Sequence, residues 1–213
     1  MLYNYSDIDI HFTFEGALIQ ALYIVSGPAN TSVPSHSHGN GCYEIHYIPS
    51  GKGNLKAKGL FYDLEPGTVY VTGPHVEHTQ IPILSDPMQE YCVYLKIQNP
   101  CKQQSHSPIM DAFTSTSFWI GKDTQGIQEL MVQLFHELNN HYFGYLPQAG
   151  LLLSQLMIYM VRNYKQRVKT QTACPQNNLA NRYPFIIENY FSRKKRRPEC
   201  PGLLSCSPIL HAA

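Results

Sequence analysis

The hydrophobic pattern of the chain changes its period once, and this change constrains the fold more than any other feature. From Ala17 to about Ile97, short runs of β-branched and aromatic residues alternate with Gly, Pro and Asn, which is typical of antiparallel β-structure. After a loop expected between Asn99 and Phe118, the period becomes 3.6 residues, which predicts helices. The sequence therefore predicts an α+β protein with its strands first and its helices second.

Eight short strands at close spacing are expected in the first part of the chain. Their ranges are 18–26, 35–38, 42–48, 53–57, 60–64, 68–72, 78–83 and 90–97. Such a series favours a small antiparallel β-barrel or jelly roll. An open sheet with loops is the alternative.

An antiparallel helix pair is expected over residues 124–140 and 151–165. In the first helix, apolar residues recur on one face with Thr124 as the expected N-cap, and the second starts near Pro147. The second helix has more apolar surface than one stripe. This surplus face either packs on the barrel or forms the seam of a homodimer, and we expect the homodimer.

Composition and charge exclude several classes of protein. With 43% hydrophobic and 15% charged residues, the chain is not of the disordered class. Residues 1–192 carry 11 basic and 14 acidic side chains, so this part is not a basic nucleic-acid binder. No secretory signal is readable at the N-terminus, no apolar run reaches the roughly 20 residues of a membrane-spanning helix, and six cysteines show no C-x-x-C spacing. We therefore expect a cytoplasmic protein with free thiols and no membrane contact.

Histidines cluster in the strand region, with five of the ten between positions 36 and 78. His36 and His38 share a strand face by the period of two, as do Glu44 and His46 on the next strand, and His78 comes from a later hairpin. Three imidazoles and one carboxylate suit Fe(II), Mn, Ni or Zn. The residues equally fit the polar lining of a cavity, satisfied by hydrogen bonds.

The motifs around these histidines resemble those of a known superfamily. The cupin signature is matched by His36 and His38, Glu44, Gly51, the turn at 65–67 (EPG) and the segment 73–78 (GPHVEH). Five residues separate His38 from Glu44, more than the three or four usual in metal-binding cupins. The finer pattern, with 43–48 (YEIHYI) leading into 50–53 (SGKG) and then 64–67 (LEPG), resembles the N-terminal effector-binding domain of AraC-type transcriptional regulators over about residues 15–192.

The resemblance implies a cupin-like barrel at residues 1–100, a loop and dimerisation helices at 101–170, and a linker, short helix and irregular basic tail at 171–213. The barrel of such regulators generally holds a small organic effector, a sugar being one candidate here. By position, the ligand-binding residues would be His36, His38, Glu44, His46 and His78. The helix pair would make the homodimer.

The last segment departs from the family pattern. Residues 183–191 resemble the entry to the DNA-binding part, but a basic run (193–197) and a stretch with three prolines follow in place of two helix-turn-helix units. We expect a truncated or frameshifted start of the DNA-binding part, and no specific nucleic acid binding by this chain alone.

Two functions from different classes remain open. The leading hypothesis is a non-enzymatic, small-molecule-sensing and dimerising domain of an AraC-type regulator, without a cofactor. The alternative is a metal-dependent cupin enzyme of dioxygenase or sugar isomerase type, in which His36, His38, Glu44 and His78 hold a divalent metal.

Overall fold

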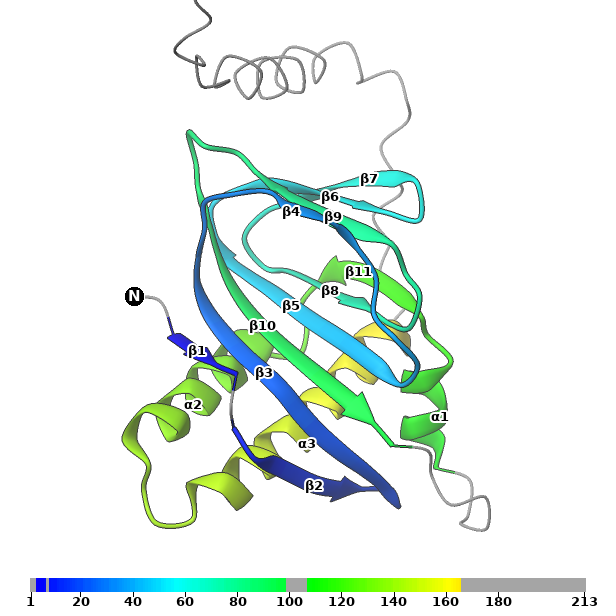
Figure 1. Ribbon diagram of the computed structural model, residues 1–213, viewed down its shortest axis with the longest axis vertical. Helices are drawn as coiled ribbons and strands as arrows, with labels where there is room; N and C mark the ends of the chain where they lie inside the picture. The colour runs from blue at the N-terminus through cyan, green and yellow to red at the C-terminus, as the bar shows by residue number, and fades with distance from the viewer. Residues whose placement is uncertain (1–2, 7, 99–106, 166–213) are drawn as a thin grey trace, which may run out of the picture. The chain divides into compact units, whose positions relative to one another are not determined.

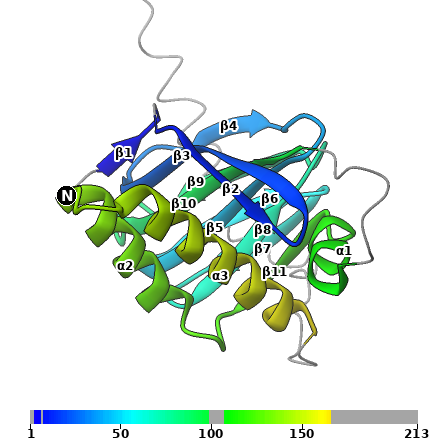
Figure 2. The ribbon, with the colours of Figure 1, turned by 90° about the horizontal axis from the view of Figure 1, so that it is seen from below.

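A computed structural model describes residues 3–6, 8–98 and 107–165, all of which lie in one compact unit, Met1–Cys174. Within these residues two antiparallel sheets face each other, and helices cover the outer side of the larger sheet (Figures 1 and 2). The expected helix at 183–191 and the basic run at 193–197 lie outside the described residues.

The larger sheet has seven strands in the described part of the chain, in the order β1-β3-β10-β5-β8-β11, with β2 paired to β3. All its pairings are antiparallel. Its strands are β1 (Tyr3–Tyr5), β2 (Ile10–Phe14), β3 (Ala17–Ala29), β5 (Cys42–Ser50), β8 (Thr68–Thr72), β10 (Met88–Ile97) and β11 (Phe118–Lys122).

The smaller sheet has four described strands in the order β4-β9-β6-β7. They are β4 (Val33–His36), β6 (Gly53–Ala57), β7 (Leu60–Leu64) and β9 (His78–Pro82). Among the described strands, no ladder of hydrogen bonds joins this sheet to the larger one. The expected fold is therefore confirmed as α+β and jelly-roll-like, but it is a two-sheet sandwich and not a closed barrel.

All eight expected strands are present, three of them with the expected bounds. The structure adds four elements that the sequence pattern missed. They are β1, β2, β11 and the helix α1 (Pro108–Thr114). The last two lie in or beside the expected loop, where β11 becomes a strand by pairing with β8, from Phe118 opposite Thr72 to Lys122 opposite Thr68. Such pairing is a tertiary contact that local periodicity does not report.

The turn that connects β5 of the larger sheet to β6 of the smaller sheet requires glycine. Gly51 has a φ of 75°, and a Cβ there would lie 2.2 Å from the carbonyl oxygen of Pro87. A side chain at this position would therefore be strained by its backbone conformation and blocked by the neighbouring loop.

The expected helix pair is present as α2 (Ile127–Asn140) and α3 (Tyr145–Lys165). Thr124 is not the N-cap, because the helix begins after Gly126 and the Asp123 carboxylate accepts from the backbone N–H of Ile127 (2.6 Å). The Thr124 hydroxyl instead donates to Oδ1 of Asn163 (2.9 Å) and so ties the start of α2 to α3. Neither α2 nor any other described helix is long and apolar enough to cross a membrane.

The two faces of β5 belong to different layers. Tyr43, Ile45 and Tyr47 face the helices, where they join a core cluster that includes most of the buried apolar residues of α2 and α3. Glu44 and His46 face the space between the sheets. The period of two along this strand therefore separates a polar interior from an apolar helix-packing surface.

Most of the apolar surface of α3 is buried inside the domain. Leu153, Leu156, Met157 and Met160 are at most 1% exposed, whereas Leu151 is 66% exposed. Packing on the sheet and on the neighbouring helices α1 and α2 thus accounts for most of the surplus apolar face that the sequence indicated.

We predict that Leu153→Ala lowers the free energy of unfolding by about 2–5 kcal/mol, because it removes buried methyl groups and leaves a cavity. Leu151→Ala, two residues earlier in the same helix, should change it by less than about 0.5 kcal/mol. Urea unfolding at low protein concentration measures both. Equal losses would contradict the packing described for α3.

Candidate ligand and metal site

The five residues singled out in the sequence come together between the two sheets. His36 lies at the end of β4, His38 in the segment after it, Glu44 and His46 on β5, and His78 at the start of β9. The sequence predicted that His38 lies on a strand, and this prediction was wrong, because β4 ends at His36. The ring of His38 still turns toward Glu44. Glu44, His46 and His78 are buried, and the other two are half-buried.

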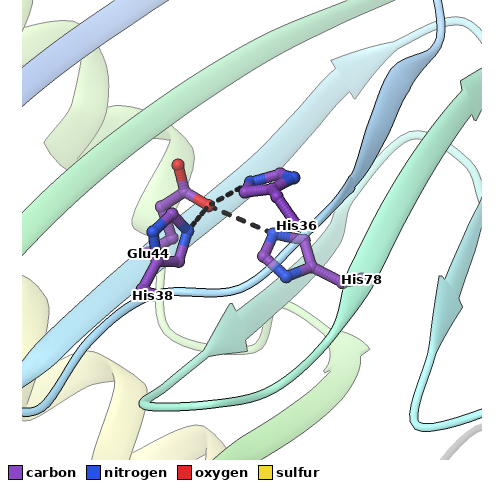
Figure 3. A group of neighbouring side chains, drawn as sticks. All are labelled: His36, His38, Glu44 and His78. Atoms are coloured by element: carbon purple, nitrogen blue, oxygen red, sulfur yellow. Dashed lines mark hydrogen bonds and ion pairs between the residues drawn. The ribbon is translucent and has the colours of Figure 1, made fainter.

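One carboxylate oxygen is the centre of this group, as Figure 3 shows for three of the rings. Glu44 Oε2 lies 2.8 Å from Nε2 of His38, 3.3 Å from Nε2 of His46 and of His78, and 3.9 Å from Nε2 of His36. Four imidazole nitrogens from three separate chain segments therefore face one oxygen atom.

Backbone carbonyls fix the tautomer of two of these rings. Nδ1 of His36 lies 2.9 Å from the carbonyl oxygen of Pro34, and Nδ1 of His78 lies 2.9 Å from that of Val76. A carbonyl only accepts, so each Nδ1 carries the hydrogen. In the neutral rings the Nε2 lone pairs then face the Glu44 carboxylate, and either ring protonation or a cation between them relieves this repulsion.

The donor set fits a divalent metal. One donor atom from each of His36, His38, Glu44 and His78 lies within 4.8 Å of all the others. Three imidazoles with one carboxylate are suitable ligands for Fe(II), Mn, Ni or Zn, and hydrogen bonds from Nδ1 to carbonyls are the usual support of metal-binding histidines. A metal held there would supply Lewis acidity at the floor of the cavity.

The environment shifts the pKa values of the central groups. Burial alone would raise the pKa of Glu44, but the hydrogen bonds and charges of His46 and His78 lower it to about 2. Burial, followed by the repulsion of neighbouring imidazoles, lowers the pKa of His38 to about 4. At neutral pH the carboxylate is thus ionised and the His38 ring neutral.

A second set of contacts surrounds His46. Its Nδ1 donates to Oε1 of Glu90 (2.5 Å), and its ring stacks on Tyr70 with centroids 4.3 Å apart. The Gln80 amide donates both to Oε1 of Glu90 (2.9 Å) and to the Tyr70 hydroxyl (3.2 Å). The ring of His46 is therefore held by a hydrogen bond at Nδ1 and by stacking on one of its faces.

Burial acts in opposite directions on the pKa values of the neighbouring His46 and Cys92 side chains. It would lower the pKa of His46, but nearby Cys92, Tyr70 and Glu90 raise that pKa well above its usual value. Burial raises the pKa of the Cys92 thiol to about 12, so this side chain is a thiol at neutral pH.

Four of the five expected site residues, all except His38, line a cavity of about 230 Å³ between the sheets. Its described lining contains two carboxylates, Glu44 and Glu90, and neither lysine nor arginine. The full lining is Tyr23, Val25, Val33, His36, Glu44, His46, Tyr70, His78, Gln80, Glu90 and Cys92.

The sequence pattern did not identify Tyr70, Gln80, Glu90 and Cys92 as parts of the site. Glu90 and Cys92 alternate along β10 and so share a face, which was the available signal. The ladder register, which places Cys92 and Tyr70 on either side of His46, decides that this face lines the cavity. Register depends on pairing between strands and is not local information.

Comparison with known families decides the identity of the domain. Residues 20–157 match the model of the AraC-like ligand binding domain. The chain belongs to this family. The match includes the positions of all five expected site residues and most of the helix pair. By its family, this AraC-like domain is a ligand-binding domain for small molecules. No curated protein matches the chain significantly.

Several solved structures are similar to this AraC-like domain at low identity. The protein YhaK from Escherichia coli is 11% identical, with 59% of this chain and 52% of that chain covered and a TM-score of 0.40. A cupin protein from Bacteroides fragilis is 23% identical (47% and 85% covered, TM-score 0.31). A predicted oxalate decarboxylase from Thermotoga maritima is 18% identical (44% and 98% covered, TM-score 0.31). The match spans about half the length of the Escherichia coli protein.

We predict that Glu44→Gln destabilises the AraC-like domain by about 3 kcal/mol, because it removes the charge that several buried imidazoles face. Glu65→Gln is the matched control. It also removes a carboxylate from a close pair, Lys122 Nζ to Glu65 Oε1 at 2.8 Å, but both side chains are exposed to solvent, so the loss should stay below about 1 kcal/mol.

Urea unfolding in the presence of EDTA, which keeps cations out of the site, measures both changes. Similar losses for the two variants would show that Glu44 is not the centre of the buried network.

Proposed function

We propose that this chain is the effector-sensing and dimerising part of an AraC-type transcription regulator, acting in the cytoplasm and without catalysis. The supporting observation is the cavity between the sheets, which lies in the domain that this family uses for ligands. The proposed ligand-binding residues are His36, His38, Glu44, His46 and His78.

The lining of the cavity favours an effector that donates hydrogen bonds. The carboxylates of Glu44 and Glu90 are acceptors, and the described lining has no lysine or arginine to pair with an anion. Tyr70 and Tyr23 add aromatic surface. A neutral polyol or sugar combines hydroxyl donors with an apolar ring face, and it avoids the repulsion that a carboxylate ligand would meet.

The same strand that lines the cavity also contacts the helices. The Tyr47 hydroxyl, on the outer face of β5, donates to Oε1 of Gln128 in α2 (3.0 Å), and the Tyr43 hydroxyl donates to the carbonyl oxygen of Thr114 (3.1 Å). Glu44 and His46 lie on the inner face of the same strand. A ligand that moves or rigidifies β5 would therefore act directly on the helix layer.

We predict that neutral sugars, screened in the presence of EDTA, include a ligand that raises the melting temperature, since a ligand that binds only the folded state stabilises it. The corresponding sugar acids should not. Glu90→Gln should weaken the affinity of that ligand about tenfold by removing a charged acceptor.

Glu129→Gln, on the exposed surface of α2, is the control and should leave the affinity unchanged. Isothermal titration calorimetry gives the affinities. Stabilisation by the acids and not by the neutral sugars would contradict this assignment of ligand class.

The proposed dimer uses the surface of the helix pair that the domain leaves exposed. Val132 in α2 and Leu151 in α3 are 49% and 66% exposed, and Phe143 in the turn between them is fully exposed. A second copy of the chain is the proposed occupant, as in the helix pairs of AraC-type regulators. Specific DNA binding is not assigned to this chain alone.

We predict that sedimentation equilibrium at tens of micromolar protein gives twice the monomer mass of 24.2 kDa. Leu151→Glu should shift the equilibrium to monomer, because it places a charge in the apolar contact. Leu84→Glu, at a similarly exposed leucine (62%) in the loop between β9 and β10, should leave the dimer intact. A monomer for the unaltered chain would refute the proposed dimer.

One observation favours the second candidate, a metal-dependent cupin enzyme of dioxygenase or sugar isomerase type. The convergence of three histidine Nε2 atoms on the Glu44 carboxylate is a fitting ligand set. Elemental analysis of the purified protein separates the candidates. Stoichiometric iron, manganese or zinc that is lost in His78→Ala would favour the enzyme, and its absence would favour the regulator.

A further inference from the structure

A second group of donor atoms shares the Glu44 carboxylate with the three-histidine set. We propose that Glu44, His46 and Cys92 form a separate binding site for a thiophilic divalent cation such as Zn²⁺. One donor atom from each residue lies within 4.8 Å of the other two, and all three side chains are buried. The proposal does not depend on the effector proposed for the cavity or on a metal in the three-histidine set, although this site shares Glu44 with that set.

The distances between the donor atoms suit a single ion. Nε2 of His46 is 3.3 Å from Oε2 of Glu44, and Sγ of Cys92 is 3.8 Å from Oε1 of the same carboxylate. In a tetrahedral zinc site, with bonds of about 2.0–2.1 Å to N and O and about 2.3 Å to S, the ligand atoms are about 3.3–3.6 Å apart. Small side-chain adjustments would close this set around zinc.

The sheet holds these residues in place before any ion binds. Cys92 is the ladder partner of His46 across β10 and β5, and Glu44 lies two residues along β5 on the same face. Both strands are inner strands of the larger sheet. The three side chains therefore start from a rigid backbone, as a specific metal site requires.

The Glu90 carboxylate orients the His46 ring through the nitrogen that does not face Glu44. Nδ1 of His46 donates to Glu90, and the Gln80 amide in turn holds that carboxylate. This leaves Nε2 of His46 directed at the Glu44 side. A carboxylate on the second nitrogen is the usual support for a metal-binding histidine.

The charges around the cluster favour a cation. The side chain of Glu44 is 3% exposed and that of Glu90 is 16% exposed, yet the described cavity lining contains no lysine or arginine. Buried carboxylates are ordinarily paired or bound to metal. Glu90 is paired with Nδ1 of His46 and with Gln80. A divalent ion at Nε2 of His46 would supply a positive charge beside Glu44.

The sulfur ligand sets the class of ion. On binding, the ion displaces the thiol proton of Cys92, which is released to solvent. The resulting thiolate with an imidazole selects zinc or cobalt(II) over magnesium, calcium and manganese, which prefer oxygen. All three residues also line the cavity, so an ion can enter from it and keep an open coordination position toward it. Because Glu44 belongs to both donor sets, its carboxylate would bridge two ions if both sets were filled.

Cobalt(II) titration tests the proposal, because a cobalt–thiolate bond gives a charge-transfer band in the near ultraviolet. The protein is the full chain with the four cysteines outside the described residues (101, 174, 200 and 206) changed to serine. We expect this band at one equivalent of cobalt, with Cys92→Ser or Cys92→Ala abolishing it and weakening zinc affinity at least tenfold.

Two control variants make the result specific. Cys42→Ser changes the other described free cysteine, which is also buried and lies on β5, and should retain the band. His36→Ala removes a ligand of the three-histidine set and should retain it too. Absence of the band in the parent protein overturns the proposal whatever the variants do, and so does a band that survives both Cys92 changes.

Discussion

The buried carboxylate of Glu44 is the interaction on which the interior of this domain depends. Its Oε2 atom lies within 4 Å of four imidazole nitrogens, and these come from the β4 end, the segment after it, β5 and β9. The larger sheet carries Glu44 and His46, and the smaller sheet carries His36 and His78. One charge therefore links the two layers where an apolar core would otherwise be expected, and it does so at the cost of desolvating a carboxylate.

The alternation along β5 lets the domain combine this polar interior with a stable core. Tyr43, Ile45 and Tyr47 pack against the helix layer, while Glu44 and His46 face the cavity. The hydrophobic stabilisation thus comes chiefly from the outer face of the larger sheet and from α2 and α3. A second apolar cluster, which includes Ile48, Leu55 and Leu64, joins strands of the two sheets, so this division leaves part of the space between the sheets for polar groups. It also puts a ligand one strand away from the helices that the proposed regulator would use for dimerisation.

The site supports more than one use of the same residues. The domain belongs to a family of ligand-binding domains. The hydrogen-bond acceptors in the cavity lining support the proposal of a neutral effector. The histidine set and the cluster of Glu44, His46 and Cys92 are both suited to cations. These proposals are separable by experiment because the carboxylate of Glu90, the ring of His36 and the thiol of Cys92 each belong to a different part of the site.

The sequence by itself determined the α+β order of the chain, eight of the eleven described strands, the helix pair, and the five polar residues that meet between the sheets, because these follow from periodicity, turn residues and local motifs. Strands β1, β2 and β11 and the roles of Glu90 and Cys92 were decided only by the tertiary structure. Each of them depends on which strand lies beside which, and in what register, as in the pairing of Cys92 with His46. Cross-strand register is set by packing between distant segments, so no local pattern could have supplied it.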